Sequence, residues 1–298
     1  MQFRDRVHGE VEIPDPEILA LVSCPTMQRL GRIKQAGPSA LALAGKDVTR
    51  LEHSLGVFLL LRRLGADRKE QVAGLLHDIS HTAFSHVVDF VFASEEHDFH
   101  EHLKPASLDR PDVVTALATT GFVPADFHDD SAYALLERPL PWLCADRVDY
   151  FLRDGLAFGV LTSEMATRIV EDLAVVDRTI VFTDVEVARA AAERFAIMNR
   201  ESWASPSDGF VYNEFAAALR AALAQGVLTR DDLLDDDASV MKKLDACSHP
   251  AIRAPLDRVL HFHVGMLDGY VEAIHPKERR LDPPVRHGDS FRRLSELG

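Results

Sequence analysis

The spacing of apolar residues predicts a protein built mainly of helices. The clearest helix is expected over residues 49–64, where Thr49 and Glu52 suit a capped start and Gly65 suits the end. A second apolar helix is expected over residues 68–79, after a short turn. Weaker helical patterns cover residues 27–35, 85–93, 113–118, 141–154 and 164–172. The predicted fold class is therefore mainly α.

One β-hairpin is predicted after these helices. Two β-branched runs, residues 173–176 and 179–182, flank the dipeptide Asp177-Arg178. Long amphipathic helices are then expected over residues 185–201 and 213–225. Their Ala-rich faces suit either a homo-oligomer interface or an ordinary core.

The last third of the chain carries two charged segments. The acidic residues 231–237 lack the glycine and terminal glutamate of a calcium loop, so we expect a solvated loop or helix start. A basic tail follows, with Lys277, Arg279, Arg280, Arg286, Arg292 and Arg293. Since no repeat or linker is evident, residues 1–298 are predicted to form a single composite domain.

Composition narrows the class of protein. The chain has 298 residues, 47% hydrophobic and 27% charged, which is an ordinary globular balance. A net charge of −14 argues against broad binding to nucleic acid. Neither a membrane span nor a secretory signal is evident. The three cysteines are widely spaced and form no CxxC pair, so we expect a cytoplasmic protein without a disulfide framework.

The most informative segment is His77-Asp78, at the end of an apolar run. A buried carboxylate is costly unless it is paired or bound to a cation, and imidazole and carboxylate are common ligands of divalent metals. Six of the 14 histidines lie within 26 positions: His77, His81, His86, His97, His100 and His102. A reaction centre explains this clustering, although a hydrogen-bonded His-Asp pair in a core is the plain alternative.

Two further segments carry polar side chains at helical spacing. Arg50 and His53 share a helix face, and Asp146, Tyr150 and Asp154 form a stripe on another. Taken alone, His53 fits a core or surface histidine, and the stripe fits ion pairs on a wet surface. Together with His77-Asp78, the segments point to a shared site.

In this combination the chain resembles the HD-domain metal-dependent phosphohydrolases, and most closely their deoxynucleoside triphosphate triphosphohydrolase branch. The resemblance rests on five ordered blocks, residues 4–10, 25–35, 49–57, 77–86 and 145–154. It implies an HD-type helical bundle over residues 1–165, with the hairpin and a helical extension over residues 166–298.

The resemblance also implies a role for each matching residue. The divalent metal (Mn, Fe, Co, Ni, Zn or Mg) would be held by His53, His77, Asp78 and Asp146. Catalytic histidines near the scissile phosphate would be His81, followed by His100 and His86. Arg50 would contact phosphate, and the sugar would contact Gln35, Tyr150 and Asp154.

The implied reaction is hydrolysis of a nucleotide, with a deoxynucleoside triphosphate cleaved to deoxynucleoside and triphosphate. Base choice is left open. Alternatives are a non-catalytic metal- and nucleotide-binding sensor, a hydrolase of a nucleoside monophosphate or another phosphate ester, and a cyclic dinucleotide or alarmone hydrolase.

The chain departs from the family pattern near the metal motif. Ser80 and Thr82-Ala83 replace the glycine and Gly-Pro that follow the HD dipeptide in most members. At the positions where some relatives bind a guanine nucleotide activator, this chain has Ser23 and Gly31. Nucleotide activation is therefore not expected.

Overall fold

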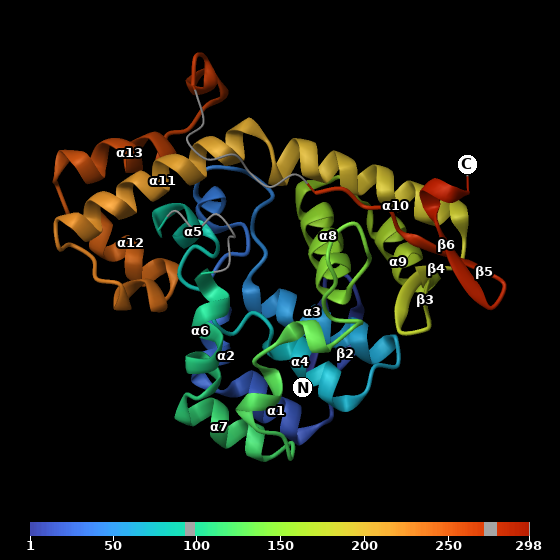
Figure 1. The fold of residues 1–298 in the computed structure, drawn as a ribbon. Coiled ribbons are helices and arrows are strands. Elements are labelled where there is room, and N and C mark those ends of the chain that lie inside the picture. The colour runs from blue at the N-terminus through green and yellow to red at the C-terminus, as the bar shows by residue number, and fades with distance from the viewer. Residues whose placement is uncertain (93–98, 271–278, 298) are drawn as a thin grey trace.

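Helices dominate the structure, as the sequence predicted (Figure 1). The computed structural model describes residues 1–92, 99–270 and 279–297. A short antiparallel hairpin, β1 (Gln2–Asp5) and β2 (Gly9–Glu12), opens the chain. The first half then contributes α1 (Pro16–Ser23), α2 (Pro25–Leu30), α3 (Arg50–Arg63), α4 (Arg68–Leu76), α5 (Val87–Phe92), α6 (Phe99–Leu108) and α7 (Pro111–Ala118). The helices α8 (Ala145–Phe158) and α9 (Ser163–Asp172) follow.

Helix α3 forms the centre of the N-terminal bundle. Its start is the one predicted, since Thr49 is the N-cap and its side chain accepts a hydrogen bond from the backbone N–H of Glu52. Residues 53–61 are all buried, because α4 and α8 pack against the helix on different sides. A polar residue within this buried stretch therefore faces protein rather than solvent, and His53 is only 1% exposed.

Several helix boundaries differ from the predicted ones. The helix predicted over residues 27–35 ends at Leu30, because Gln35 donates its backbone N–H to Val48 instead of continuing the helix. The helix predicted over residues 141–154 begins only at Ala145 and runs to Phe158. Helix α4 ends at Leu76, so His77 and Asp78 lie at the start of a turn.

The predicted β-hairpin is confirmed. β3 (Leu173–Val176) pairs antiparallel with β4 (Thr179–Phe182), and Asp177 and Arg178 have φ values of 47° and 56°. Positive φ at both turn residues matches the twist of the paired strands. The basic tail was not predicted to be a strand, yet β5 (Pro284–His287) and β6 (Ser290–Arg293) extend the sheet in the order β3-β4-β5-β6.

The C-terminal helices form a second apolar core beside α5. Helix α10 (Val185–Met198) leads through a π-helical turn, Asn199–Trp203, into α11 (Pro206–Ala224). Ser205 caps α11, so this helix starts seven residues before the predicted one. Helices α12 (Asp237–Asp245) and α13 (Pro250–Leu260) complete this part, seen at the left of Figure 1.

The acidic segment 231–237 lies at a helix start, as expected, but it is only partly exposed to solvent. Asp236 is buried and caps α12, and it also pairs with Arg32. The Asp237 carboxylate accepts backbone N–H groups of Lys34 and Phe84 at 2.8 and 2.6 Å. Part of the segment therefore fastens the C-terminal helices to the N-terminal bundle.

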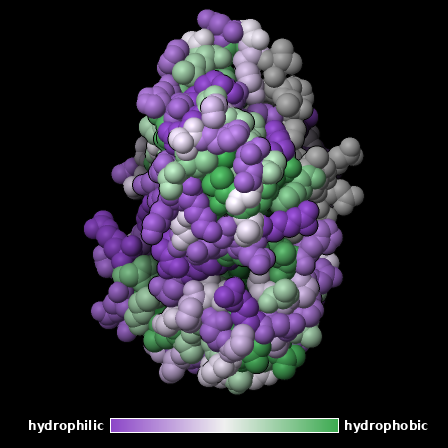
Figure 2. All heavy atoms as spheres, turned by 90° about the vertical axis from the view of Figure 1, so that its left-hand side faces the viewer, coloured by the Kyte–Doolittle hydropathy of each residue, from purple (hydrophilic) through white to green (hydrophobic). Residues whose placement is uncertain are grey.

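Hydrophilic side chains prevail on the face shown in Figure 2, with hydrophobic ones in small groups among them. Within the described residues, no helix combines the length and apolar character that crossing a bilayer requires.

Candidate metal centre and its cavity

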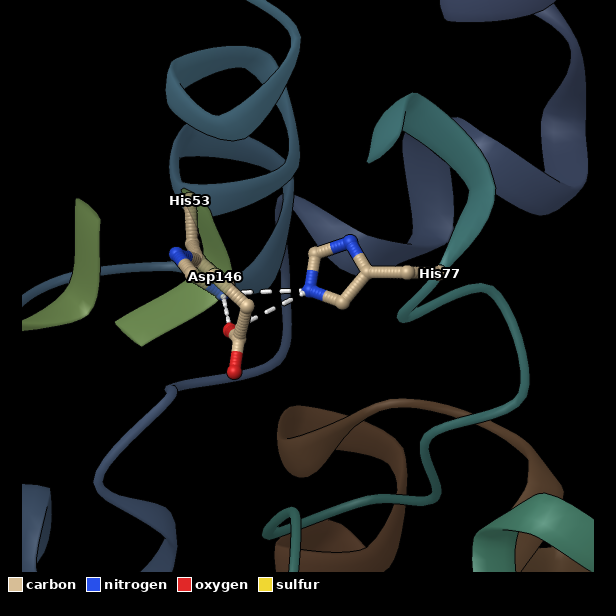
Figure 3. A group of neighbouring side chains, drawn as sticks. All are labelled: His53, His77 and Asp146. Atoms are coloured by element: carbon tan, nitrogen blue, oxygen red, sulfur yellow. Dashed lines mark hydrogen bonds and ion pairs between the residues drawn. The ribbon is translucent and has the colours of Figure 1, made fainter. Parts of the chain in front are cut away.

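Three side chains from different helical segments converge at the centre of the bundle (Figure 3). His53 comes from α3, His77 from the end of α4 and Asp146 from the first turn of α8. The Nε2 atom of His53 lies 2.9 Å from Asp146 Oδ1 and 3.2 Å from Nε2 of His77. Asp146 Oδ1 lies 3.5 Å from His77 Nε2.

Asp78 also lies close to both imidazoles. Its Oδ1 lies 3.4 Å from His77 Nε2, and its Oδ2 lies 3.9 Å from His53 Nε2. The carboxylate also accepts a hydrogen bond from Arg50 Nη1 at 2.8 Å. All four residues predicted as metal ligands are thus neighbours, although they are up to 93 positions apart in the chain.

The donor set fits a divalent metal ion. Ligand atoms about 2.1 Å from an ion lie roughly 3 to 3.5 Å from one another. The donor atoms of His53, His77 and Asp146 have about this spacing, at 2.9 to 3.5 Å, and Asp78 lies 3.4 Å from His77 and 3.9 Å from His53. Both imidazoles are held with Nε2 toward the centre, because His53 Nδ1 donates to Asp149 Oδ2 and His77 Nδ1 to the carbonyl of Gly74, each at 2.8 Å. Such anchoring of the outer nitrogen is typical of metal-binding histidines.

The electrostatics of the centre favour a cation. Burial opposes a charged imidazole, yet hydrogen bonds to Asp146 and Asp149 raise the pKa of His53 to about 10. Burial likewise opposes charge on His77, whose pKa is raised mainly by the Asp78 carboxylate. Burial opposes ionisation of Asp78 too, but Arg50 and the histidines hold its pKa well below the usual range. The carboxylates that stabilise a proton on these rings would also stabilise a metal ion at the same point.

A buried ionic network that no sequence motif indicated lies on the Nδ1 side of His53. Arg153 is fully buried and donates to Asp149, Asp5 and Glu52 at 2.7, 2.8 and 3.0 Å. Asp149 therefore bridges Arg153 and His53. The available signal was the helical spacing, since Asp149 and Arg153 lie four residues apart on α8.

Replacement of Asp149 by asparagine is expected to weaken metal binding without removing a ligand. The neutral amide stabilises the inward-facing tautomer of His53 less well, and loss of such a partner typically lowers metal affinity by about 10- to 100-fold. Titration of the metal-free protein with Mn²⁺ or Co²⁺ measures the change. Asp5→Asn is the matched control, because Asp5 bonds to Arg153 but not to His53; equal losses of affinity in both variants would contradict the prediction.

The predicted catalytic histidines follow the metal motif. His81 Nε2 lies 3.1 Å from Asp78 Oδ1, and the rings of His81 and His86 stand edge to face at 4.8 Å. His86 Nδ1 lies 3.2 Å from the buried carboxylate of Asp89, a residue that the sequence analysis missed. The backbone of His100 belongs to α6, but its side chain lies outside the described residues, as does His97.

The loop that carries these histidines has an unusual backbone. Phe84 and Ser85 have φ values of 57° and 54°, which are strained for residues other than glycine. Asp237 holds the backbone N–H of Phe84, and Ser85 Oγ donates to the carbonyl of Lys34 while it accepts from Arg50 Nε. Ser80 and Thr82-Ala83, which replace the family's glycine and Gly-Pro, therefore directly precede a backbone segment that hydrogen bonds hold in place.

A cavity of about 680 Å³ opens beside the metal centre. It is lined by all ten described residues that the sequence predicted for the site: Gln35, Arg50, His53, His77, Asp78, His81, His86, Asp146, Tyr150 and Asp154. Other lining residues were not predicted, among them Lys46, Glu137, Trp203, Tyr212 and Arg279. Most of these come from segments without a recognisable motif, so only the folded chain brings them together.

Two of the unpredicted residues form ion pairs in the cavity wall, Lys46 with Asp208 and Glu137 with Arg147. Lys46 is buried and donates to Ser202 Oγ at 2.7 Å and to Asp208 Oδ1 at 3.2 Å. Burial and the nearby charge of Asp146 raise the pKa of Glu137 to about 7. The stripe of Asp146, Tyr150 and Asp154 faces this cavity and not a wet outer surface.

Comparison with known proteins identifies the family. A scan against models of protein families matches residues 50–110 to the HD domain. The chain is 34% identical over 295 residues to the uncharacterized protein YdhJ of Bacillus subtilis, covering 98% of this chain and 90% of that one. It is 33% identical over 291 residues to the metal-dependent phosphohydrolase cns2 of Cordyceps militaris, covering 95% and 84%. The chain therefore belongs to the HD-domain metal-dependent phosphohydrolases and uses a divalent metal ion.

Two further similarities are narrower. A crystal structure of a phosphohydrolase from Bacteroides thetaiotaomicron has a TM-score of 0.68 at 20% identity, covering 100% of this chain and 94% of that one, and it supports the fold. The deoxynucleoside triphosphate triphosphohydrolase SAMHD1 of Danio rerio is 36% identical over 105 residues, which is 30% of this chain and 17% of that protein.

Proposed function

We propose that this phosphohydrolase acts on nucleotides and that His53, His77, Asp78 and Asp146 hold its metal. The observation that carries the proposal is the shared cavity, in which the four metal-binding candidates lie beside candidate contacts for phosphate and sugar. A divalent ion bound there supplies a Lewis acid for a phosphate oxygen and lowers the pKa of water.

The chain's own residues would bind the substrate and move protons. Arg50 lies against Asp78 and presents a guanidinium to the cavity, where it would neutralise charge on phosphate oxygens. His81, which contacts Asp78, would donate a proton to the leaving oxygen, and His86, which contacts Asp89, would assist. His100 remains a proposed second proton donor.

Deoxynucleoside triphosphates are the first candidate substrates. The support is the partial match to SAMHD1, a protein named for that activity, together with the cavity positions of Gln35, Tyr150 and Asp154. Cleavage would then release deoxynucleoside and triphosphate. A cytoplasmic location and a homo-oligomeric state stay predictions beside this one.

The charge of the cavity favours a second candidate, a nucleoside monophosphate. Seven acidic and five cationic side chains line it, so even a bound divalent ion leaves little positive charge for a triphosphate. Several cations are already paired: Arg50 with Asp78, Lys46 with Asp208, and Lys104 with Asp130. A monophosphate carries about two negative charges and needs less compensation.

A nucleotide panel distinguishes the candidates. The purified protein, loaded with Mn²⁺ or Co²⁺, is incubated with each deoxynucleoside triphosphate and monophosphate, and the products are identified by mass spectrometry. Free triphosphate with deoxynucleoside supports the first candidate, whereas deoxynucleoside with inorganic phosphate from monophosphates supports the second. Nucleotide binding without turnover across several metals would support a sensor, and a metal-loaded protein that neither binds nor hydrolyses any nucleotide would contradict the proposal.

A further inference from the structure

The C-terminal extension places a tryptophan against the wall of the cavity. Trp203 is the last residue of the π-helical turn Asn199–Trp203, which joins α10 to α11. Its indole Nε1 donates a hydrogen bond to Oδ2 of Asp154 at 2.8 Å. Both residues line the cavity, although they are 49 positions apart and come from the extension and from α8.

The position of Trp203 is fixed from several sides. Its ring stands edge to face with Tyr150 at 5.2 Å and with Phe195 at 5.1 Å. The neighbouring residue Ser202 accepts a hydrogen bond from Lys46, and the Arg279 guanidinium lies 5.9 Å from the centre of the Trp203 ring. A π-helical turn is rare and is often found at functional sites. The indole N–H is therefore a fixed donor.

The bond to Trp203 restrains one carboxylate oxygen of Asp154. A carboxylate has about four acceptor positions, so Asp154 keeps acceptor capacity toward the cavity after the indole bond is made. A cavity carboxylate held in one orientation is suited to accept a hydrogen bond from a ligand hydroxyl. Rotation of the Asp154 side chain would break this geometry, and the indole bond opposes that rotation.

We infer that Trp203 is a positioning residue that determines specificity for a sugar hydroxyl through Asp154. This inference rests on the proposed nucleotide substrate and adds a residue that the sequence motifs do not contain. The nucleotide sugar would lie against Tyr150 and Asp154, with one hydroxyl donating to the carboxylate that Trp203 holds.

The test removes the N–H donor and keeps the aromatic ring. Trp203→Phe is compared with wild type on two substrates that differ only in the 3′-hydroxyl: a 2′-deoxynucleotide, with the phosphate chain that wild type hydrolyses, and its 2′,3′-dideoxy analogue. We expect wild type to have a higher kcat/KM for the substrate with the 3′-hydroxyl than for the dideoxy analogue. In Trp203→Phe this ratio should fall about 10-fold, mainly because KM for the hydroxylated substrate rises. Turnover of the dideoxy analogue should change little.

Two further variants separate positioning from packing. Trp142→Phe is the matched control, since Trp142 is the only other tryptophan and stacks on Arg293 outside the cavity lining; its preference should equal that of wild type. Asp154→Asn should lose the same preference, and combining it with Trp203→Phe should cause little further loss.

The outcomes are distinguishable. Equal loss of activity on both substrates in Trp203→Phe would overturn the inference, as would a wild-type enzyme that hydrolyses both substrates equally well, and the proposed function would stand in either case. No turnover of any nucleotide by wild type would remove the proposed function and this inference together.

Discussion

Replacement of Asp146 by alanine is expected to abolish both metal retention and hydrolysis. Asp146 Oδ1 lies within 3.5 Å of Nε2 of both His53 and His77, so its carboxylate is shared by the whole cluster. Without it, one ligand is lost and less negative charge remains to hold the cation. Because the ligands act as a unit, we expect activity to fall by roughly 10³-fold or more. Metal content by mass spectrometry and initial rates at saturating metal measure the two effects.

Asp129→Ala is the control for Asp146→Ala. Asp129 is another carboxylate of the cavity lining, but it is exposed and bonds to Ser131. This variant should retain its metal and most of its activity. Thermal unfolding of each metal-free variant shows whether either chain has simply failed to fold. Full metal retention by a folded Asp146→Ala variant would contradict the assignment of Asp146 as a ligand.

The candidate metal ligands could be predicted because they belong to short local motifs. His77 and Asp78 are adjacent, and their position after an apolar helix already indicated burial. His53 and Asp146 were found through resemblance, since each taken alone fits an ordinary core or surface residue. The short distances among His53, His77, Asp78 and Asp146 support a shared site. The spacing of residues along one helix could not show how the three segments that carry them meet in space.

The cavity wall was less predictable, because it depends on contacts between distant segments. Trp203 stands in no motif, and its relation to Asp154 follows from the π-helical turn between two long helices. Asp237 was read as a surface residue because neighbouring acidic residues usually face solvent. Its role in holding the backbone of Phe84 and Lys34 depends on how α12 docks onto the bundle.

Substitution of Gly56 by alanine is expected to be the most damaging change outside the candidate metal ligands. Alanine is normally favoured over glycine inside a helix by about 1 kcal/mol. Here a Cβ atom on α3 would lie 2.0 Å from Asp149 Oδ1 and 2.1 Å from Arg153 Nη2. Both side chains are buried and bonded to each other, so neither can move without leaving a buried charge poorly paired.

The expected result of Gly56→Ala is a loss of about 3 kcal/mol or more in the free energy of unfolding, together with weaker metal binding. Metal binding suffers because a displaced Asp149 no longer orients His53. Urea unfolding of the metal-free protein and Mn²⁺ titration measure the two effects separately. Ser54→Ala on the same helix is the control, because the buried Ser54 Oγ has no hydrogen-bond partner among the described residues. A Gly56→Ala protein as stable as wild type would show that the Asp149–Arg153 pair can shift, and the rigid support inferred for His53 would then be wrong.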